Sequence, residues 1–165
     1  MEVTVGPSYL TARDLFESAR EASRDAERIR RQLLSMESAA EGLGGSGFEP
    51  RVASTGEPDR MAARVAAMVD RESMLAARLE GDYALIDRAC EVLYGEDGRG
   101  GLWSLVGWRA DAIWHHYLGG RTWAEVAALL GYGERHVREQ AMAALDVCDG
   151  WGLASVAGGS GGAEG

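Results

Sequence analysis

The sequence predicts an all-α protein in which a long antiparallel helical hairpin, similar to a coiled coil, precedes a C-terminal three-helix unit with a helix-turn-helix. Apolar and small residues recur with the alternating three- and four-residue spacing of helices that pack along a seam. Only 3 of the 165 residues are proline, and the 23 glycines cluster between these periodic stretches. The last third is rich in tryptophan and interrupted by short turns. An all-β fold is therefore not expected.

The first periodic stretch predicts a helix that begins after Thr11 and ends at Gly42. Thr11 suits the N-cap position, and Asp14 follows it by three residues. A loop over 42–57 then contains Gly-Gly-Ser-Gly and Pro50. The predicted seam of this helix consists of Leu15, Ala19, Ala22, Ala26, Ile29, Leu33, Met36 and Ala40.

A second helix is predicted to open near Asp59 and to complete a hairpin over 9–94. Glu72 and Asp82 interrupt its seam, and they either face arginines of the first helix or mark a drift of the apolar stripe. Two helices of this composition bury little area, so we expect the hairpin to self-associate or to dock on the C-terminal part. The alternative is that the hairpin serves only as a structural scaffold. The remaining seam positions are Met61, Val65, Met68, Leu75, Leu79, Ile86, Ala89 and Leu93.

The C-terminal part is divided by glycines into a joint (95–101), a helix-turn-helix domain (102–150) and a flexible tail (151–165). One helix is expected over 102–118, with Trp103, Trp108 and Trp114 packing around it. Thr122 and Glu125 form the capping-box pattern at the start of a short helix that ends before Gly131. The last helix is predicted over 134–148, with Val137, Ala141, Ala144, Leu145 and Cys148 facing inward.

A helix, a short glycine turn and a second helix with a polar outer face form the helix-turn-helix plan, in which the second helix enters the major groove. Guanidinium groups near its start can bind guanine or phosphate. The N–H groups at Thr122, beside Arg121, can hold a phosphate. The candidate DNA-binding residues are Arg121, Thr122, Glu134, Arg135, His136, Arg138 and Glu139.

The stretch from Tyr117-Leu-Gly-Gly-Arg-Thr-Trp-Ala-Glu-Val-Ala to Leu130-Gly-Tyr-Gly-Glu-Arg-His-Val resembles the helix-turn-helix of sigma factor region four. It is most similar to the variant in RinA-like and ArpU-like transcriptional regulators of phages and prophages. The segment Arg51–Asp59, with Val65 and Val69-Asp70, is similar to one in an uncharacterised phage family with that motif. The resemblance implies a phage-encoded DNA-binding regulator that acts through Thr122, Arg135, His136 and Arg138.

Three features depart from that family pattern. Gly133 stands where Ser is usual as the N-cap of the second helix, and Glu139 stands where a basic residue is common. The stretch 102–148 has four arginines against five acidic residues. These departures lower the expected affinity for DNA more than they threaten the fold.

Composition argues against several other classes of protein. The net charge is −9 and all 17 basic residues are arginine. This balance argues against electrostatic binding of the whole protein to nucleic acid or to anionic lipid, since both require a basic face. No catalytic constellation, metal-ligand spacing or nucleotide loop is present, so we expect no enzyme, metal or cofactor. Cys90 and Cys148 are interpreted as reduced structural thiols, and His115 and His116 as packing or surface residues. We expect neither export nor a membrane span, and hence a cytoplasmic location in a bacterial host.

Three functional hypotheses follow. The first is a phage or prophage regulator that binds double-stranded DNA as a homo-oligomer assembled through the hairpin. The second is a DNA-packaging protein akin to small terminase subunits. The third is an adaptor that docks on host RNA polymerase without touching DNA, which the acidic balance favours.

Overall fold

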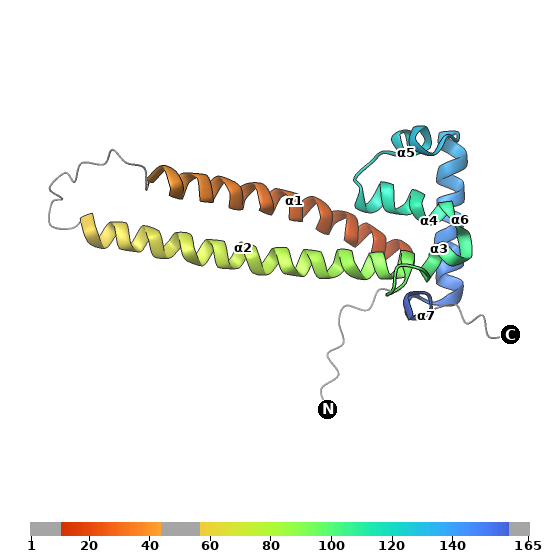
Figure 1. The fold of residues 1–165 in the computed structure, drawn as a ribbon, viewed down its shortest axis with the longest axis horizontal. Helices are drawn as coiled ribbons and strands as arrows, with labels where there is room; N and C mark the ends of the chain where they lie inside the picture. Colours follow the sequence, from red (N-terminus) through yellow and green to blue (C-terminus); the bar gives the residue numbers. More distant parts are fainter. Residues whose placement is uncertain (1–10, 44–56, 159–165) are drawn as a thin grey trace, which may run out of the picture. The chain divides into compact units, whose positions relative to one another are not determined.

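The computed structural model describes residues 11–43 and 57–158, and all regular structure in these ranges is helical (Figure 1). This confirms the all-α class with its long N-terminal helix pair. Residues 1–10, 44–56 and 159–165 lie outside the described residues, and with them most of the predicted loop, the segment from Arg51 and the chain end. The elements are α1 (Ala12–Leu43), α2 (Glu57–Tyr94), α3 (Gly101–Val106), α4 (Trp108–Ile113), a π-helical turn η1 (Trp114–Leu118), α5 (Trp123–Leu130), α6 (Glu134–Trp151) and α7 (Leu153–Gly158).

The chain forms two compact units. Of the described residues, the first contains 11–24 and 83–158, and the second contains 25–43 and 57–82. Both long helices, α1 and α2, therefore contribute residues to both units. The predicted domains, 9–94 and 102–150, keep each long helix whole. The two compact units instead divide both long helices, because the units are defined by which residues pack together.

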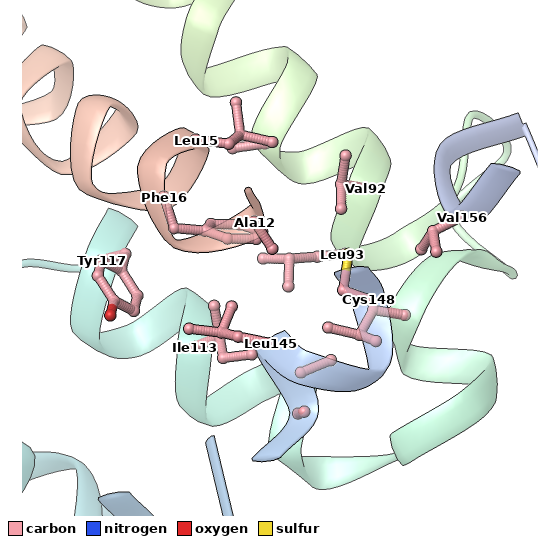
Figure 2. Packing of buried hydrophobic residues seen from close by; sticks show 14 of the residues in the cluster. Ala12, Leu15, Phe16, Val92, Leu93, Ile113, Tyr117, Leu145, Cys148 and Val156 are labelled. Atoms are coloured by element: carbon pink, nitrogen blue, oxygen red, sulfur yellow. The ribbon is translucent and has the colours of Figure 1, made fainter. Parts of the chain in front are cut away.

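The first unit has a core to which helices distant in sequence contribute (Figure 2). Thr11 caps α1 as predicted, because its Oγ1 accepts a hydrogen bond from the Asp14 N–H at 3.1 Å. The Ala12 N–H donates to Asp149 Oδ1 of α6 at 2.6 Å, which ties the start of α1 to the C-terminal part of α6. The core includes Leu15, Phe16, Val92, Leu93, Ile113, Tyr117, Leu145, Cys148 and Val156.

A smaller cluster holds the helix-turn-helix together. Val126 and Ala127 of α5 and Val137 of α6 are buried against Ala112 of α4. Trp108, Trp123 and Leu130 pack against this cluster and are half-buried. The inward residues predicted for the last helix, from Val137 to Cys148, are all buried.

Two parts of the C-terminal prediction need correction. The single helix expected over 102–118 is divided into α3, α4 and η1. Gly107 has a positive φ (+63°) and ends α3, and the chain passes from α4 into the π-helical turn η1 at Trp114. The tail expected over 151–165 begins with the end of α6 and with α7. Val156 of α7 is buried in the core, and this burial orders a segment whose composition alone indicated a loose end.

The glycine joint predicted over 95–101 is a tight turn between α2 and α3. The Gly95 N–H donates to the Glu91 carbonyl at 2.7 Å, and the Gly100 N–H donates to the Tyr94 carbonyl at 2.7 Å. Gly101 has a φ of +64°, and a Cβ added there would lie 2.5 Å from the Gly95 nitrogen. This close approach of two backbone segments admits only glycine.

We expect Gly101→Ala to lower the free energy of unfolding by more than about 3 kcal/mol, because a rigid backbone atom must move to admit the methyl group. Gly98→Ala is the matched control: its φ is also positive (+76°), but no atom lies within 4 Å of an added Cβ. The control should cost about 1–2 kcal/mol from backbone strain alone. Urea unfolding followed by circular dichroism measures both. Equal losses would contradict the close approach.

The second unit is a pair of helical segments, 25–43 of α1 and 57–82 of α2. Ala26 and Ile29 of the predicted seam are buried, while Met61 and Val65 near the start of α2 are exposed. The buried Asp25 accepts two hydrogen bonds from Arg78, one of them from Nε to Oδ2 at 2.7 Å. This bidentate pair joins the two segments at the end of the unit that contains Asp25 and Asp82.

Asp82, one of the two predicted interruptions of the seam, faces a carboxylate. Burial, then a hydrogen bond with Asp25 and the charge of Asp25, raise the pKa of Asp82 to about 6. The same hydrogen bond and the nearby Arg78 and Arg28 lower the pKa of Asp25. Oδ2 of Asp82 is buried with no donor among the described residues, which fits a protonated Asp82 that donates to an ionised Asp25.

Stability of the second unit should therefore fall as pH rises through about 6. The Asp82 carboxyl of the unfolded chain ionises near the ordinary value of 3.8, but the folded chain holds its proton up to about pH 6. Asp82→Asn, which keeps a donor toward Asp25, should be more stable than the parent chain at pH 8 by roughly 1–2 kcal/mol, solvent screening included. At pH 4 the two should be equal.

Chemical unfolding between pH 4 and pH 8 checks this prediction. Asp70→Asn, at an exposed position of the same helix, is the control and should track the parent chain. If Asp82→Asn also tracks the parent at every pH, the two carboxyls do not share a proton.

Candidate nucleic-acid interface

The predicted helix-turn-helix is formed by α5, a three-residue turn and α6 (Figure 1). Thr122 caps α5 as predicted, because its Oγ1 accepts a hydrogen bond from the Glu125 N–H at 3.2 Å. Gly131 is left-handed (φ +79°), and its N–H donates to the Ala127 carbonyl at 2.9 Å, which ends α5. Gly133 is the N-cap of α6 and supplies no side-chain hydrogen bond.

The N-terminal half of α6 presents the predicted polar face to solvent. Glu134, Arg135, His136, Arg138 and Glu139 are all exposed. A shallow groove follows this face. It is lined by Arg135, Arg138, Glu139, Met142, Ala143 and Asp146. The burial of Val137 and Ala141 on the opposite side of α6 orients these side chains outward.

Arg135 and Glu139 form an ion pair on this face, with 2.9 Å between Nε and Oε1. Both side chains are well exposed, at 91% and 61%. The hydrogen bond that Arg135 donates to Glu139, and then the charge of Glu139, raise the pKa of Arg135. Glu139 therefore competes with an anionic ligand for Arg135, whereas no carboxylate oxygen among the described residues lies within 4.0 Å of the Arg138 guanidinium.

Arg121 is half-buried and engaged within the fold. Its Nη1 donates to Nδ1 of His115 at 2.8 Å, and its carbonyl accepts a hydrogen bond from Nδ1 of His116 at 2.7 Å. Burial, then the charge of Arg121, lower the pKa of His115. Arg121 thus positions the N-terminus of α5, and part of its hydrogen-bonding capacity is already used.

His116 lies at the centre of this region and is 6% exposed. Its ring stacks on Trp123 at 3.8 Å between centroids, and its Nε2 accepts a hydrogen bond from Nη1 of Arg20 at 3.2 Å. The pKa of His116 is lowered, first by burial and then by the charges of Arg20, Arg138 and Arg24. The packing role expected for His116 is confirmed, and the neutral ring links α1 to the start of α5.

Aromatic side chains pack against the turn between α5 and α6. Trp108 stacks on Tyr132 at 4.5 Å between centroids, and the His136 ring lies 5.6 Å from Tyr132 and 6.0 Å from Trp108. The Arg109 guanidinium lies 5.1 Å from the centre of the Trp108 ring. His136 is therefore exposed, but its ring packs near Trp108 and Tyr132, whose stacking supports the turn.

Sequence reasoning missed the arginines of α1. Arg13 Nη2 lies 3.1 Å from Met142 Sδ on the α6 groove, and Arg20 contacts His116, although about a hundred residues separate the partners. No local signal in the sequence indicates these contacts. They arise because Leu15, Phe16 and Ala19, on the other side of α1, are buried in the core of the first unit.

Within 11–43 and 57–158, no group of three or more metal-ligating side chains comes together, and no helix is long and apolar enough to cross a membrane. Cys90 and Cys148 are both free thiols. Comparison with family models, with characterised proteins and with solved structures finds no match to this chain.

Proposed function

We propose that this chain is a phage or prophage transcriptional regulator that binds double-stranded DNA through α5 and α6. The main support is the exposure of Arg135 and Arg138 on the first two turns of α6, directly after a tight turn that fixes the direction of that helix. An Arg side chain at the start of a second helix-turn-helix helix has the length and the fork geometry to bind guanine O6 and N7 or a phosphate.

The resemblance to sigma factor region four supports the same proposal, and the Thr122 cap and the glycine turn lie in the segment that carries it. Some of the acidic side chains are engaged by arginines of the same chain. Glu139 is engaged by Arg135, and the carboxylates of Asp25 and Glu27 are engaged by arginines of the second unit.

Replacing Arg135 and Arg138 by alanine should weaken binding to fragments of mixed phage DNA by at least about tenfold, because each lost contact removes about 1–3 kcal/mol. Fluorescence anisotropy at low and at physiological salt measures this. Arg88→Ala/Arg99→Ala changes the net charge equally at two exposed positions of the first unit and should bind as the parent chain does.

Glu139→Gln should strengthen binding, since it releases Arg135 and removes a negative charge from the groove. Parent protein that binds no DNA even at low salt would overturn the proposal and favour an adaptor that docks on RNA polymerase. A double mutant that binds as well as the parent chain would remove α6 from the interface.

We further propose that a second copy of the chain binds the second unit. Met61, Val65 and Val69 follow one another at four-residue intervals on α2 and are more than half exposed, at 58%, 56% and 54%. An exposed ridge of this kind on a helical pair is a typical interface for self-association. Two copies would present two α6 helices to successive half-sites about 34 Å apart.

Val65→Asp/Val69→Asp should convert the assembly to monomers and weaken DNA binding, because two linked contacts become one. Sedimentation velocity gives the stoichiometry, and anisotropy gives the affinity. Ala63→Asp/Ala67→Asp places the same charges at exposed positions on the opposite face of α2 and should leave the assembly intact. A monomeric parent chain would contradict self-association, and a large ring would favour the packaging protein.

A further inference from the structure

We propose that Arg13, Arg20 and Arg24 of α1, together with Arg138 of α6, form a binding surface for the phosphates of double-stranded DNA. We call these four residues the arginine face. The inference rests on the proposed function and extends it, because none of the α1 residues belongs to the helix-turn-helix.

The α1 arginines share one face of their helix. They are spaced by seven and four residues, which brings successive side chains to nearly the same angle around an α-helix. The opposite face, with Leu15 and Ala19, is buried in the core of the first unit. The first turns of α1 therefore cannot rotate to present a different set of side chains.

Direct contacts place this part of α1 beside the helix-turn-helix. Arg13 reaches Met142 in the α6 groove at 3.1 Å, and Arg20 donates to His116 at 3.2 Å. One turn further along α1, the Ser23 hydroxyl donates to the Leu118 carbonyl at 3.1 Å, just before the turn that leads to α5. The helix thus follows the groove side of α6 and the entry to α5.

The charges of the arginine face converge on the same buried rings. Arg20, Arg138 and Arg24 all lower the pKa of His116, after burial, which is the larger cause. The pKa of Tyr117 is raised by burial and by Glu17, and Arg13, Arg20 and Arg138 oppose this shift. Each of the four positive charges therefore acts on at least one of these two neighbouring rings, and Glu17 is an acidic residue close to Tyr117.

The four arginines of the arginine face are not among those that form ion pairs with carboxylates of the described residues. Arg28, Arg31, Arg78 and Arg135 each pair with a carboxylate. For the four residues of the arginine face, no carboxylate oxygen in the described part of the chain lies within 4.0 Å. A protein of net charge −9 thus keeps four guanidinium groups without a direct ion pair to a described carboxylate next to its helix-turn-helix.

Phosphate is the ligand that fits this chemistry. Guanidinium groups are weakly hydrated and bind phosphate oxygens in a bidentate manner. From Arg13 to Arg24 the helix advances about 16 Å, which corresponds to about five base pairs along one strand of a duplex. The spacing favours contacts to several successive phosphates over the capture of a single small anion.

The test uses the full chain and a fluorescein-labelled, mixed-sequence duplex of about 30 base pairs, at salt concentrations of about 50 to 200 mM. Arg13→Gln/Arg24→Gln should bind about tenfold more weakly and should reduce the slope of log affinity against log salt by up to about two. Arg20 is left in place because its Nε is buried and it supports His116. Arg88→Gln/Arg99→Gln is the charge-matched control and should behave as the parent chain does.

Glu17→Gln gives a change of the opposite sign and should tighten binding. Thermal unfolding of each variant confirms that the fold is kept. If the parent binds and Arg13→Gln/Arg24→Gln matches it in affinity and salt slope, the arginine face is overturned while the proposed function stands. If the parent does not bind the duplex, or prefers a single strand of equal length, both are overturned.

Discussion

Burial of the first turns of α1 is the constraint on which the first unit depends. Ala12, Leu15 and Phe16 occupy the middle of a core to which α2, α4, η1, α6 and α7 also contribute (Figure 2). These side chains are fully buried, so removing them from water stabilises the unit and also sets the rotation of α1. The neutral His116, which accepts from Arg20 and donates to the Arg121 carbonyl, then connects this helix to the start of α5.

The distribution of charge matters more than its sum. Over the whole chain acidic residues exceed basic ones, which by itself argues against binding to a polyanion. In the second unit, Arg28, Arg31 and Arg78 are engaged by carboxylates, as in the bidentate pair of Arg78 with Asp25. In the first unit, the guanidinium groups of α1 meet a neutral histidine and a thioether. The electrostatic character of the molecule therefore differs between these two regions.

The candidate site was predictable from the sequence as far as it is local. The Thr122 cap, the turn at Gly131 and the outward face of α6 all follow from residue types at short spacing, and the structure contains each of them. The sequence could not show that Arg135 donates a hydrogen bond to Glu139 or that Arg121 donates one to His115, because rotamers and burial decide these contacts. Nor could it associate Arg13 with Met142, since 129 residues separate them.

The sequence by itself determined the helical class, the long helix pair, the helix-turn-helix and most of its buried residues, because periodicity and capping act within a few residues. Only the tertiary structure decided how these helices are grouped into units. Gly107 has a positive φ and separates α3 from α4 within a stretch that the periodicity predicts as one helix. Val156 is buried in the core, and the segment predicted to be a flexible tail contains α7. The tertiary structure also decided which arginines lie near His116. Contacts between distant segments depend on which apolar faces are buried together, and this packing involves the whole chain rather than a few neighbouring residues.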